Sequence, residues 1–139
     1  MAHSHDMPTD LTRNQELVLG TLNASGGPLS AYDILDKLRG DGLRAPLQVY
    51  RALDKLVDRG FAHRLESLNA FVACADMHCH RKKGLIAFAI CEGCGKVDEF
   101  ADEVIEDRLG AWAAAEGFKV ERTTMEIRGR CAECLAKAA

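Results

Sequence analysis

Residues 46–74 read PLQVYRALDKLVDRGFAHRLESLNAFVAC. Pro46 suits the first turn of a helix, because a residue in that turn needs no backbone N–H. Apolar residues at helical spacing give this helix one core face: Val49, Leu53, Leu56 and Val57. Gly60 ends it, since glycine favours the position just past a helix C-terminus. The segment therefore predicts an amphipathic helix that begins at Pro46.

Two β-compatible runs follow this helix, residues 61–66 and 70–74, and the turn-like residues 67–69 join them. Two further helices are predicted upstream. Thr12 has capping-box spacing to the residue three positions on, and Ser30 is a good N-cap for a second helix. Three helices followed by a two-stranded hairpin are typical of a winged helix-turn-helix domain.

The outer face of the third helix is basic, which predicts a DNA contact. In a major groove, Arg51 can make a bidentate contact to guanine, while Lys55 and Arg59 lie near phosphates. The alternative is an ordinary solvated face, which the neighbouring aspartates favour. Tyr32 in the second helix contacts a base or phosphate, or else packs against a helix. The residues turned outward are Gln48, Arg51, Ala52, Lys55 and Arg59. The candidate DNA-binding residues are Tyr32, Gln48, Tyr50, Arg51, Lys55 and Arg59.

Two Cys-x-x-Cys pairs lie in the second half of the chain, Cys91 with Cys94 and Cys131 with Cys134. Two intervening residues let both sulfurs of a pair turn toward one ion, at Zn–S distances of about 2.3 Å. The pairs therefore predict one tetrahedral structural zinc. Disulfides are the first alternative and a thioredoxin-like redox motif is the second. The redox motif needs a helix that begins at the pair, whereas Gly95 follows Cys94.

The composition sets further bounds on the protein class. The chain has 139 residues and a formal net charge of −3, so bulk charge does not indicate a nucleic-acid partner and a local patch would have to supply it. No apolar run approaches the roughly 18 residues that a membrane span needs. Residues 1–10 are polar and lack the apolar core of a signal peptide. We therefore expect a cytoplasmic protein with reduced thiols and no membrane partner.

The second half of the chain predicts a small α/β domain. Its strand candidates are residues 85–91, 96–100, 118–121 and 124–128, and its helix candidates are residues 101–116 and 131–137. The longer helix carries an apolar stripe that we expect in the core: Val104, Ile105, Leu109 and Trp112. Because the domain is small, we expect a homodimer to bury strand 96–100 or strand 124–128. The fold class is therefore α+β, with a winged-helix domain at 1–76, a hinge at 77–84 and a dimerisation domain at 85–139.

Further histidines and cysteines gather around the predicted hinge: His63, Cys74, His78, Cys79 and His80. Two neutral imidazoles, one thiolate and one carboxylate would make a four-coordinate site, and the thiolate favours zinc over iron(II) or manganese(II). His63 and Cys74 lie on opposite strands of the predicted hairpin, so both can face the hinge. Taken singly, Cys74 fits a small buried hydrophobe and His63 fits a surface residue. Their density predicts a second metal site.

Four motifs occur in order along the chain: Val49-Tyr50-Arg51-Ala52-Leu53-Asp54, Gly60-Phe61-Ala62-His63-Arg64, Cys91-Glu92-Gly93-Cys94-Gly95-Lys96-Val97 and Cys131-Ala132-Glu133-Cys134. They resemble motifs of the ferric uptake regulator (Fur) superfamily, and most closely its zinc uptake regulators, over roughly residues 11–135. The resemblance implies a homodimeric winged-helix repressor with a C-terminal α/β dimerisation domain. It also implies that the two cysteine pairs hold structural zinc and that Arg51 and Tyr32 contact bases.

The resemblance implies a regulatory zinc site as well, made by His63, Cys74, one hinge histidine and Glu99. We take His80 as the hinge ligand and His78 as the alternative, because this hinge differs in length from the family pattern. The His-x-His that adjoins the first cysteine pair in Fur proteins stands well upstream here. That displacement favours zinc over iron sensing.

The sequence thus predicts a zinc-responsive repressor with two zinc ions per monomer. It would bind palindromic operators on double-stranded DNA as a zinc-loaded homodimer and repress zinc-uptake genes. The alternatives are an iron(II)-responsive repressor, a zinc store that ignores DNA and a zinc-dependent hydrolase. We do not expect an enzyme, because hydrolase motifs are missing and the fourth ligand closes the metal site. Asp36 and Arg39 form a plain surface pair, which we favour, or bridge two dimers on one operator.

Overall fold

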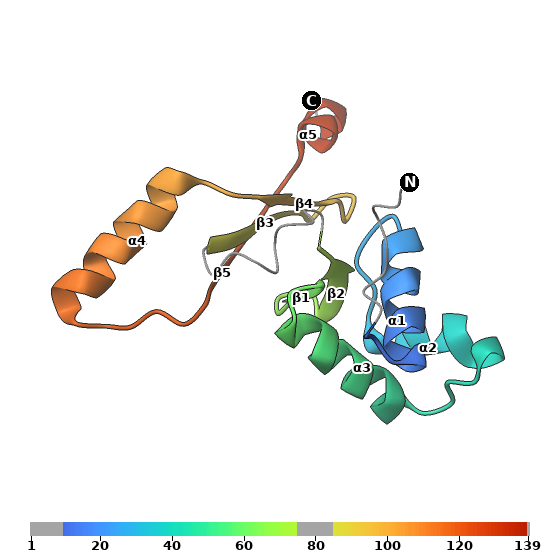
Figure 1. The fold of residues 1–139 in the computed structure, drawn as a ribbon. Helices are drawn as coiled ribbons and strands as arrows, with labels where there is room; N and C mark the ends of the chain where they lie inside the picture. Colours follow the sequence, from blue (N-terminus) through green and yellow to red (C-terminus); the bar gives the residue numbers. More distant parts are fainter. Residues whose placement is uncertain (1–9, 75–84, 139) are drawn as a thin grey trace, which may run out of the picture. The chain divides into compact units, whose positions relative to one another are not determined.

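The computed structural model describes residues 10–74 and 85–138, shown in Figure 1. The chain divides into two compact units, Met1–His80 and Arg81–Ala139. We refer to them as the first and the second unit. The predicted hinge, residues 77–84, lies outside the described residues, together with both of its candidate histidines.

Capping boxes begin the first two helices. At the start of α1 (Arg13–Ala24), the Thr12 hydroxyl accepts from the Gln15 N–H at 3.2 Å, and the Gln15 side chain accepts from the Thr12 N–H at 3.1 Å. Ser30 makes the same reciprocal arrangement at the start of α2 (Ala31–Leu38). Each box satisfies two backbone donors that a helix N-terminus leaves without partners. Both predicted N-caps are therefore confirmed.

A tight turn separates α2 from α3 (Pro46–Asp58). The short 3-10 helix η1 (Arg39–Asp41) ends at Gly42, whose φ of 102° lies in the left-handed region that glycine adopts at low cost. The Arg13 guanidinium donates to the Asp41 carbonyl at 3.0 Å and so ties the start of α1 to this turn. Pro46 occupies the first turn of α3, as predicted.

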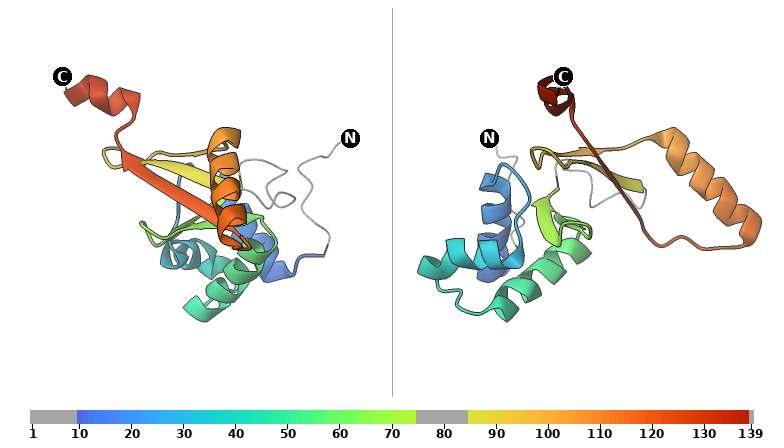
Figure 2. Two further views of the ribbon diagram at one scale, coloured as in Figure 1. Left: turned by 90° about the vertical axis from the view of Figure 1, so that its left-hand side faces the viewer. Right: turned by 180° about the vertical axis from the view of Figure 1, so that it is seen from behind.

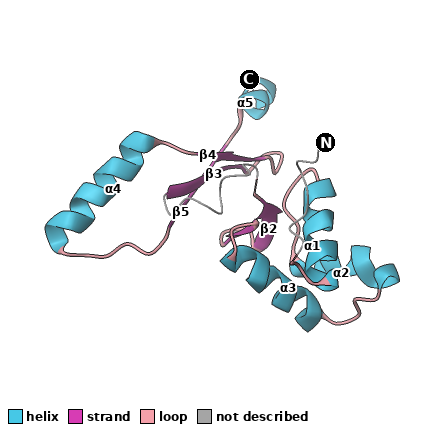
Figure 3. Cartoon of the chain, viewed as in Figure 1, coloured by secondary structure: helices cyan, strands magenta, loops and turns pink. Residues whose placement is uncertain are grey.

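A hairpin closes the first unit. Strands β1 (Ala62–Leu65) and β2 (Ala70–Ala73) pair antiparallel, and Leu29 adds an isolated bridge to β2. The three helices and the hairpin enclose one apolar core (Figure 3). Its fully buried side chains include Val18, Ile34, Leu43, Val49, Leu53 and Leu56. This is the winged helix-turn-helix arrangement that the sequence predicts.

A three-stranded sheet organises the second unit. Strand β3 (Leu85–Cys91) is central, with β4 (Val97–Phe100) antiparallel on one side and β5 (Thr123–Gly129) parallel on the other. Parallel neighbours need a long crossover connection, which α4 (Glu103–Glu116) supplies (Figure 2). The short helix α5 (Ala132–Ala138) follows β5. The mixed α+β fold class is confirmed.

The apolar stripe of α4 does not lie in a core of this chain, contrary to our expectation. Val104, Leu109 and Trp112 are 72%, 37% and 55% exposed, whereas Ala113 on the same helix is buried. Figures 1 and 2 show α4 extending away from the sheet of its own unit. The expectation failed because helical periodicity reports an apolar face but does not say which chain covers it.

The predicted strand at residues 118–121 is also wrong, because these residues have irregular backbone. The Phe118 ring instead packs on Trp112, with ring centroids 5.5 Å apart. Alternating apolar residues at 118 and 120 were a misleading strand signal, since no neighbouring strand pairs with them in the described sheet. Among the described residues, no helix is both long and apolar enough to cross a membrane.

Candidate metal centre and nucleic-acid interface

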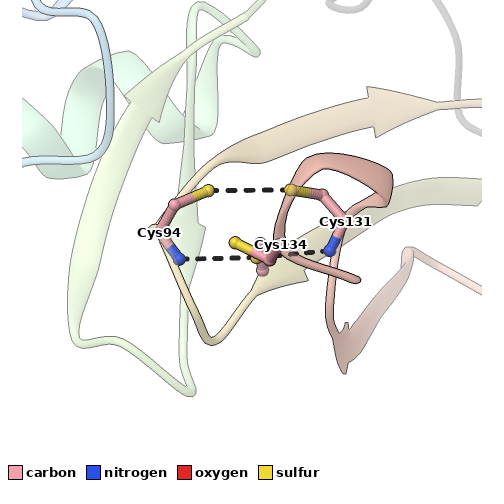
Figure 4. Close-up of side chains that lie close together, drawn as sticks. Cys94, Cys131 and Cys134 are labelled. Atoms are coloured by element: carbon pink, nitrogen blue, oxygen red, sulfur yellow. Dashed lines mark hydrogen bonds between the residues drawn. The ribbon is translucent and has the colours of Figure 1, made fainter. Parts of the chain in front are cut away.

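The four cysteines of the two Cys-x-x-Cys pairs converge in the second unit. The Cys91 and Cys134 sulfurs lie 3.6 Å apart, and the Cys94 and Cys131 sulfurs lie 3.8 Å apart. All four sulfurs lie within 4.8 Å of one another. A regular tetrahedron of sulfurs around zinc, with Zn–S of about 2.3 Å, has edges of about 3.8 Å. The donor set and its spacing therefore fit a single structural zinc, and Figure 4 shows three of the residues.

The register of the sheet explains how residues so far apart in sequence meet. Cys91 is the last residue of β3 and lies opposite Gly129 in the parallel strand β5. Cys131 comes two residues after Gly129 and so reaches the same end of the sheet. Helix α5 then brings Cys134 back toward the first pair within one turn. The parallel register thus places both pairs at one edge.

A tight knuckle orients the first pair. The Gly95 N–H donates to the Cys91 carbonyl at 2.9 Å, and Gly95 has a φ of 81°, in the region that favours glycine. Gly93 faces the second pair so closely that a Cβ atom on it would lie 2.9 Å from the Cys134 sulfur. Two glycines are therefore required by the geometry of this knuckle, one for its backbone angle and one for its lack of a side chain.

The thiols at this centre have strongly different pKa values. Hydrogen bonds from the backbone N–H groups of Cys131, Cys94 and Gly93, at 3.3, 3.4 and 3.3 Å, lower the pKa of Cys91 to about 6. Hydrogen bonding with the Cys91 and Cys131 side chains, together with burial, raises the pKa of Cys134 to about 12. Without a cation, the Cys91 sulfur, with its lowered pKa, therefore lies beside the Cys134 thiol, whose pKa is raised.

The pKa of Cys94 is also raised by its neighbouring sulfurs. The Lys96 N–H lowers its pKa, but the Cys91 and Cys131 side chains and burial outweigh that effect, so the net pKa is raised. Crowded sulfurs resist simultaneous ionisation because the thiolate charges repel. A divalent cation removes this conflict, since it takes the place of the protons and pairs with every sulfur.

The proposed regulatory ligands lie in both units. His63 on β1 is buried, and a ring nitrogen of His63 lies within 4.8 Å of the sulfur of Cys74, which directly follows β2. The Cys74 N–H donates to the Phe61 carbonyl at 3.0 Å, which extends the hairpin by one pair and fixes this approach. Cys74 is disulfide-bonded in this structure, and only its reduced thiolate can bind a metal. Glu99 is half-buried on β4 of the second unit.

Some of the predicted DNA-binding residues are exposed, and others are partly buried or hydrogen-bonded within the chain. Arg51 and Lys55 are exposed, and Tyr32 on α2 is 61% exposed, so Tyr32 does not pack into the core. Tyr50 is half-buried against the helical core. Ala52, which we expected to face outward, is buried and only 3% exposed. The sequence could not show whether Ala52 is buried or exposed, because it lies at the margin between the apolar and polar faces of the helix and its small side chain fits either.

Two of the predicted DNA-binding residues have structural roles. The Gln48 side-chain oxygen accepts from the Arg44 and Ala45 N–H groups at 2.8 and 3.1 Å, which caps α3. The sequence did contain this signal, because Pro46 at the first helical position puts Gln48 at the capping-box position. Arg59 donates to the Asp10 carboxylate at 3.1 Å, and its guanidinium lies 5.1 Å from the centroid of the Phe61 ring.

Comparison with known proteins places this chain in a family. The sequence pattern of the ferric uptake regulator family matches residues 8–128. The zinc uptake regulation protein of Escherichia coli (strain K12) is 40% identical over 128 residues, which cover 90% of this chain and 72% of that protein. The ferric uptake regulation protein of the same strain is 32% identical over 108 residues, which cover 76% of this chain and 69% of that protein.

Solved structures of zinc uptake regulators also resemble this chain. A structure of a zinc uptake regulator complexed with zinc and DNA matches with a TM-score of 0.83 at 37% identity, covering 93% of this chain and 86% of that one. The crystal structure of holo XcZur matches with a TM-score of 0.79 at 41% identity, covering 91% of this chain and 86% of that one. The resemblance inferred from the four motifs is confirmed, and the chain belongs to the ferric uptake regulator family.

Proposed function

We propose that this protein is a zinc-responsive transcriptional repressor that acts in the cytoplasm on operators of zinc-uptake genes. The observation that carries the proposal is the 40% identity to a zinc uptake regulation protein across 90% of the chain. A winged-helix unit with exposed Arg51 and Lys55 on α3 supports DNA as the partner. The weaker match, at 32% identity, to a ferric uptake regulation protein makes an iron(II)-responsive repressor the less favoured alternative.

Two zinc ions per monomer are part of this proposal. Cys91, Cys94, Cys131 and Cys134 would hold the structural ion, and their mutual sulfur distances of 3.6 and 3.8 Å support it. Zinc bound to four thiolates stabilises the fold and leaves no position open for catalysis. With this ion in place, the end of β3 and the start of α5 are joined, so the small second unit gains a crosslink that its core alone does not provide.

The second ion would be the regulatory one. We assign its ligands to His63, Cys74, Glu99 and a hinge histidine, His80, with His78 as the alternative. The close approach of His63 and Cys74 on the hairpin supports the first two of these ligands. Because the set draws on both units, ligand binding would restrict how the DNA-binding unit moves relative to the second unit. Shifting such an equilibrium from 1:99 to 99:1 requires about 5.5 kcal/mol of differential affinity.

A homodimer would supply the second DNA-binding unit that a palindrome requires. The exposed apolar residues of α4, including Val104 at 72% and Trp112 at 55%, support burial against a second copy of the chain. Both β4 and β5 are edge strands of the sheet and could extend the interface. In the single chain, Asp36 and Arg39 pair with each other at 3.3 Å, which supports a plain surface pair over a bridge between two dimers on one operator.

The test is DNA binding by the purified, reduced protein under buffered free zinc, with iron(II) and manganese(II) in parallel. The DNA is a promoter fragment of a zinc-uptake gene, and a scrambled fragment of equal length is the control. Zinc-selective binding to the promoter fragment is the expected result. Binding that responds to iron(II) instead of zinc would favour the iron(II)-responsive repressor. A folded, zinc-loaded protein that binds neither fragment would contradict a regulatory role.

A further inference from the structure

Leu47 is a large apolar side chain that α3 turns toward solvent. It is 56% exposed, whereas Val49, Leu53 and Leu56 on the same helix are fully buried. A single exposed leucine is ordinary on a protein surface, so exposure alone decides nothing. The position of Leu47 is more informative, because it lies in the first turn of α3, directly after Pro46.

The first turn of α3 is where a recognition helix reads bases. In helix-turn-helix proteins, the N-terminal residues of the second helix contact base edges in the major groove. Leu47 precedes Arg51 by four residues, so the two side chains are neighbours on one helix face, with Cβ atoms about 5–6 Å apart. Arg51 is exposed, and a base that contacts Arg51 therefore has neighbours within reach of Leu47.

The side chain of Gln48, the polar residue of this turn, already bonds to the backbone before α3. Its side-chain oxygen already accepts two hydrogen bonds, from the Arg44 and Ala45 N–H groups at 2.8 and 3.1 Å. A bidentate contact to adenine uses both the oxygen and the nitrogen of a glutamine amide. Gln48 would therefore have to give up the cap of α3 to read adenine, which leaves Leu47 as the contact from this turn.

The apolar group that a base edge offers in the major groove is the C5 methyl of thymine. We propose that Leu47 packs against a thymine methyl beside the guanine that Arg51 reads, which makes Leu47 a specificity-determining residue. The proposal rests on the proposed DNA-binding function and adds one base preference to it. The contact is apolar, so it discriminates thymine from cytosine and uracil without a hydrogen bond.

The experiment removes the methyl group and the leucine separately. Operators are selected from random DNA with the full-length, zinc-loaded protein, and each half-site thymine is then replaced by deoxyuridine, which keeps the base pair and deletes the methyl. For the wild type we expect one position to weaken binding about three- to five-fold, the effect of burying one methyl-sized group. In Leu47→Ala the same replacement should have no effect, while Leu47→Met should retain a loss.

A matched control separates this contact from a general loss of affinity. Leu68→Ala truncates another exposed leucine, 40% exposed on the hairpin turn, and should keep the wild-type response to that deoxyuridine. Circular dichroism of Leu47→Ala should match the wild type, because an exposed side chain is removed. If the selection yields no operator, the proposed function fails with this inference. If an operator binds and Leu47→Ala keeps the full deoxyuridine penalty, the inference alone is overturned.

Discussion

Gly93 and Cys134 approach so closely that a Cβ atom on Gly93 would lie 2.9 Å from the Cys134 sulfur. This contact joins the knuckle after β3 to helix α5, two elements that are far apart in sequence. Real Cβ atoms do not approach a sulfur that closely, so one of the two segments would have to move. The identity of residue 93 is therefore coupled to the geometry of the cysteine centre.

Gly93→Ala should weaken zinc binding at this centre. Overpacking of this kind typically costs about 1–3 kcal/mol, which we expect as a lower midpoint of thermal unfolding and as faster zinc loss to a chromogenic chelator. Gly129→Ala is the matched control, because a Cβ there meets nothing within 4 Å. Equal zinc retention by the two variants would show that the knuckle tolerates the added methyl and would contradict the prediction.

Zinc binding to the metal-free, reduced protein should release protons. The pKa of Cys134 is raised to about 12 and that of Cys94 is also raised, so both thiols carry protons near neutral pH and must lose them to bind the ion. Calorimetric titrations in buffers of different ionisation enthalpy, near pH 7, should therefore show release of more than one proton per zinc ion at this site. Release close to zero would contradict these protonation states.

The same pKa values set the pH dependence of zinc affinity. Protons compete with zinc for Cys94 and Cys134, so affinity should rise steadily with pH through neutrality. The pKa of Cys91 is lowered to about 6, so this sulfur also binds a proton as the pH falls through about 6, and affinity should then fall more steeply. Competition with a chelator of known pH dependence measures the slope.

Cys74→Ser should abolish zinc-responsive DNA binding and leave the structural ion in place. The substitution replaces a soft thiolate by a hydroxyl that binds zinc poorly, within 4.8 Å of the His63 ring. Zinc content should fall by one equivalent while circular dichroism is preserved. Cys79→Ser, assayed under the same reducing conditions, is the control and should respond to zinc as the wild type does. Unchanged zinc response in Cys74→Ser would remove Cys74 from the regulatory site.

Arg51→Ala should weaken operator binding, whereas Gln48→Ala should lower stability. Loss of a bidentate guanine contact costs about 1–3 kcal/mol and relaxes preference at one base pair, so Arg51→Ala should affect operator more than random DNA. Gln48→Ala removes the cap of α3 and should lower the free energy of unfolding by about 0.5–2 kcal/mol, while the base preference stays unchanged. Competition assays with single-base operator variants distinguish the two outcomes.

Val104→Glu should dissociate the proposed homodimer. Val104 is 72% exposed in the single chain, so the change costs little there, whereas a carboxylate buried at an apolar interface is strongly unfavourable. Sedimentation velocity should show a monomer with wild-type circular dichroism. Glu106→Gln, on the same helix and exposed, is a control that should leave the association state unchanged. A dimeric Val104→Glu protein would place the interface elsewhere.

Local sequence signals predicted most of the fold. Thr12, Ser30 and Pro46 mark helix starts because capping depends on a few adjacent residues, and all three predictions are confirmed. The hairpin strands and β3 were also predicted within a residue or two of their observed bounds. The spacing within each cysteine pair predicted a shared ion, since a short segment alone fixes how two sulfurs can turn.

The burial of some residues depended on neighbours that local patterns do not contain. Ala52 is buried although we expected it to face outward, and Phe118 packs on Trp112 instead of joining a strand. The apolar stripe of α4 was recognised, but its exposure in the single chain was not. Each error concerns what packs against an element, which depends on contacts between distant segments.

The sequence by itself determined the order of the helices and of every strand but the false one at residues 118–121, the caps and the ligand types of the cysteine centre, because these depend on residues that are near one another in the chain. Only the tertiary structure decided that β5 runs parallel to β3, which carries Cys131 to the end of the strand that Cys91 terminates. It also decided that Gly93 has no room for a Cβ atom beside Cys134 and that the oxygen of Gln48 accepts the hydrogen bonds that cap α3. Strand register and side-chain approach are set by long-range packing, so the sequence names the ligands while the fold brings their sulfurs within 4.8 Å.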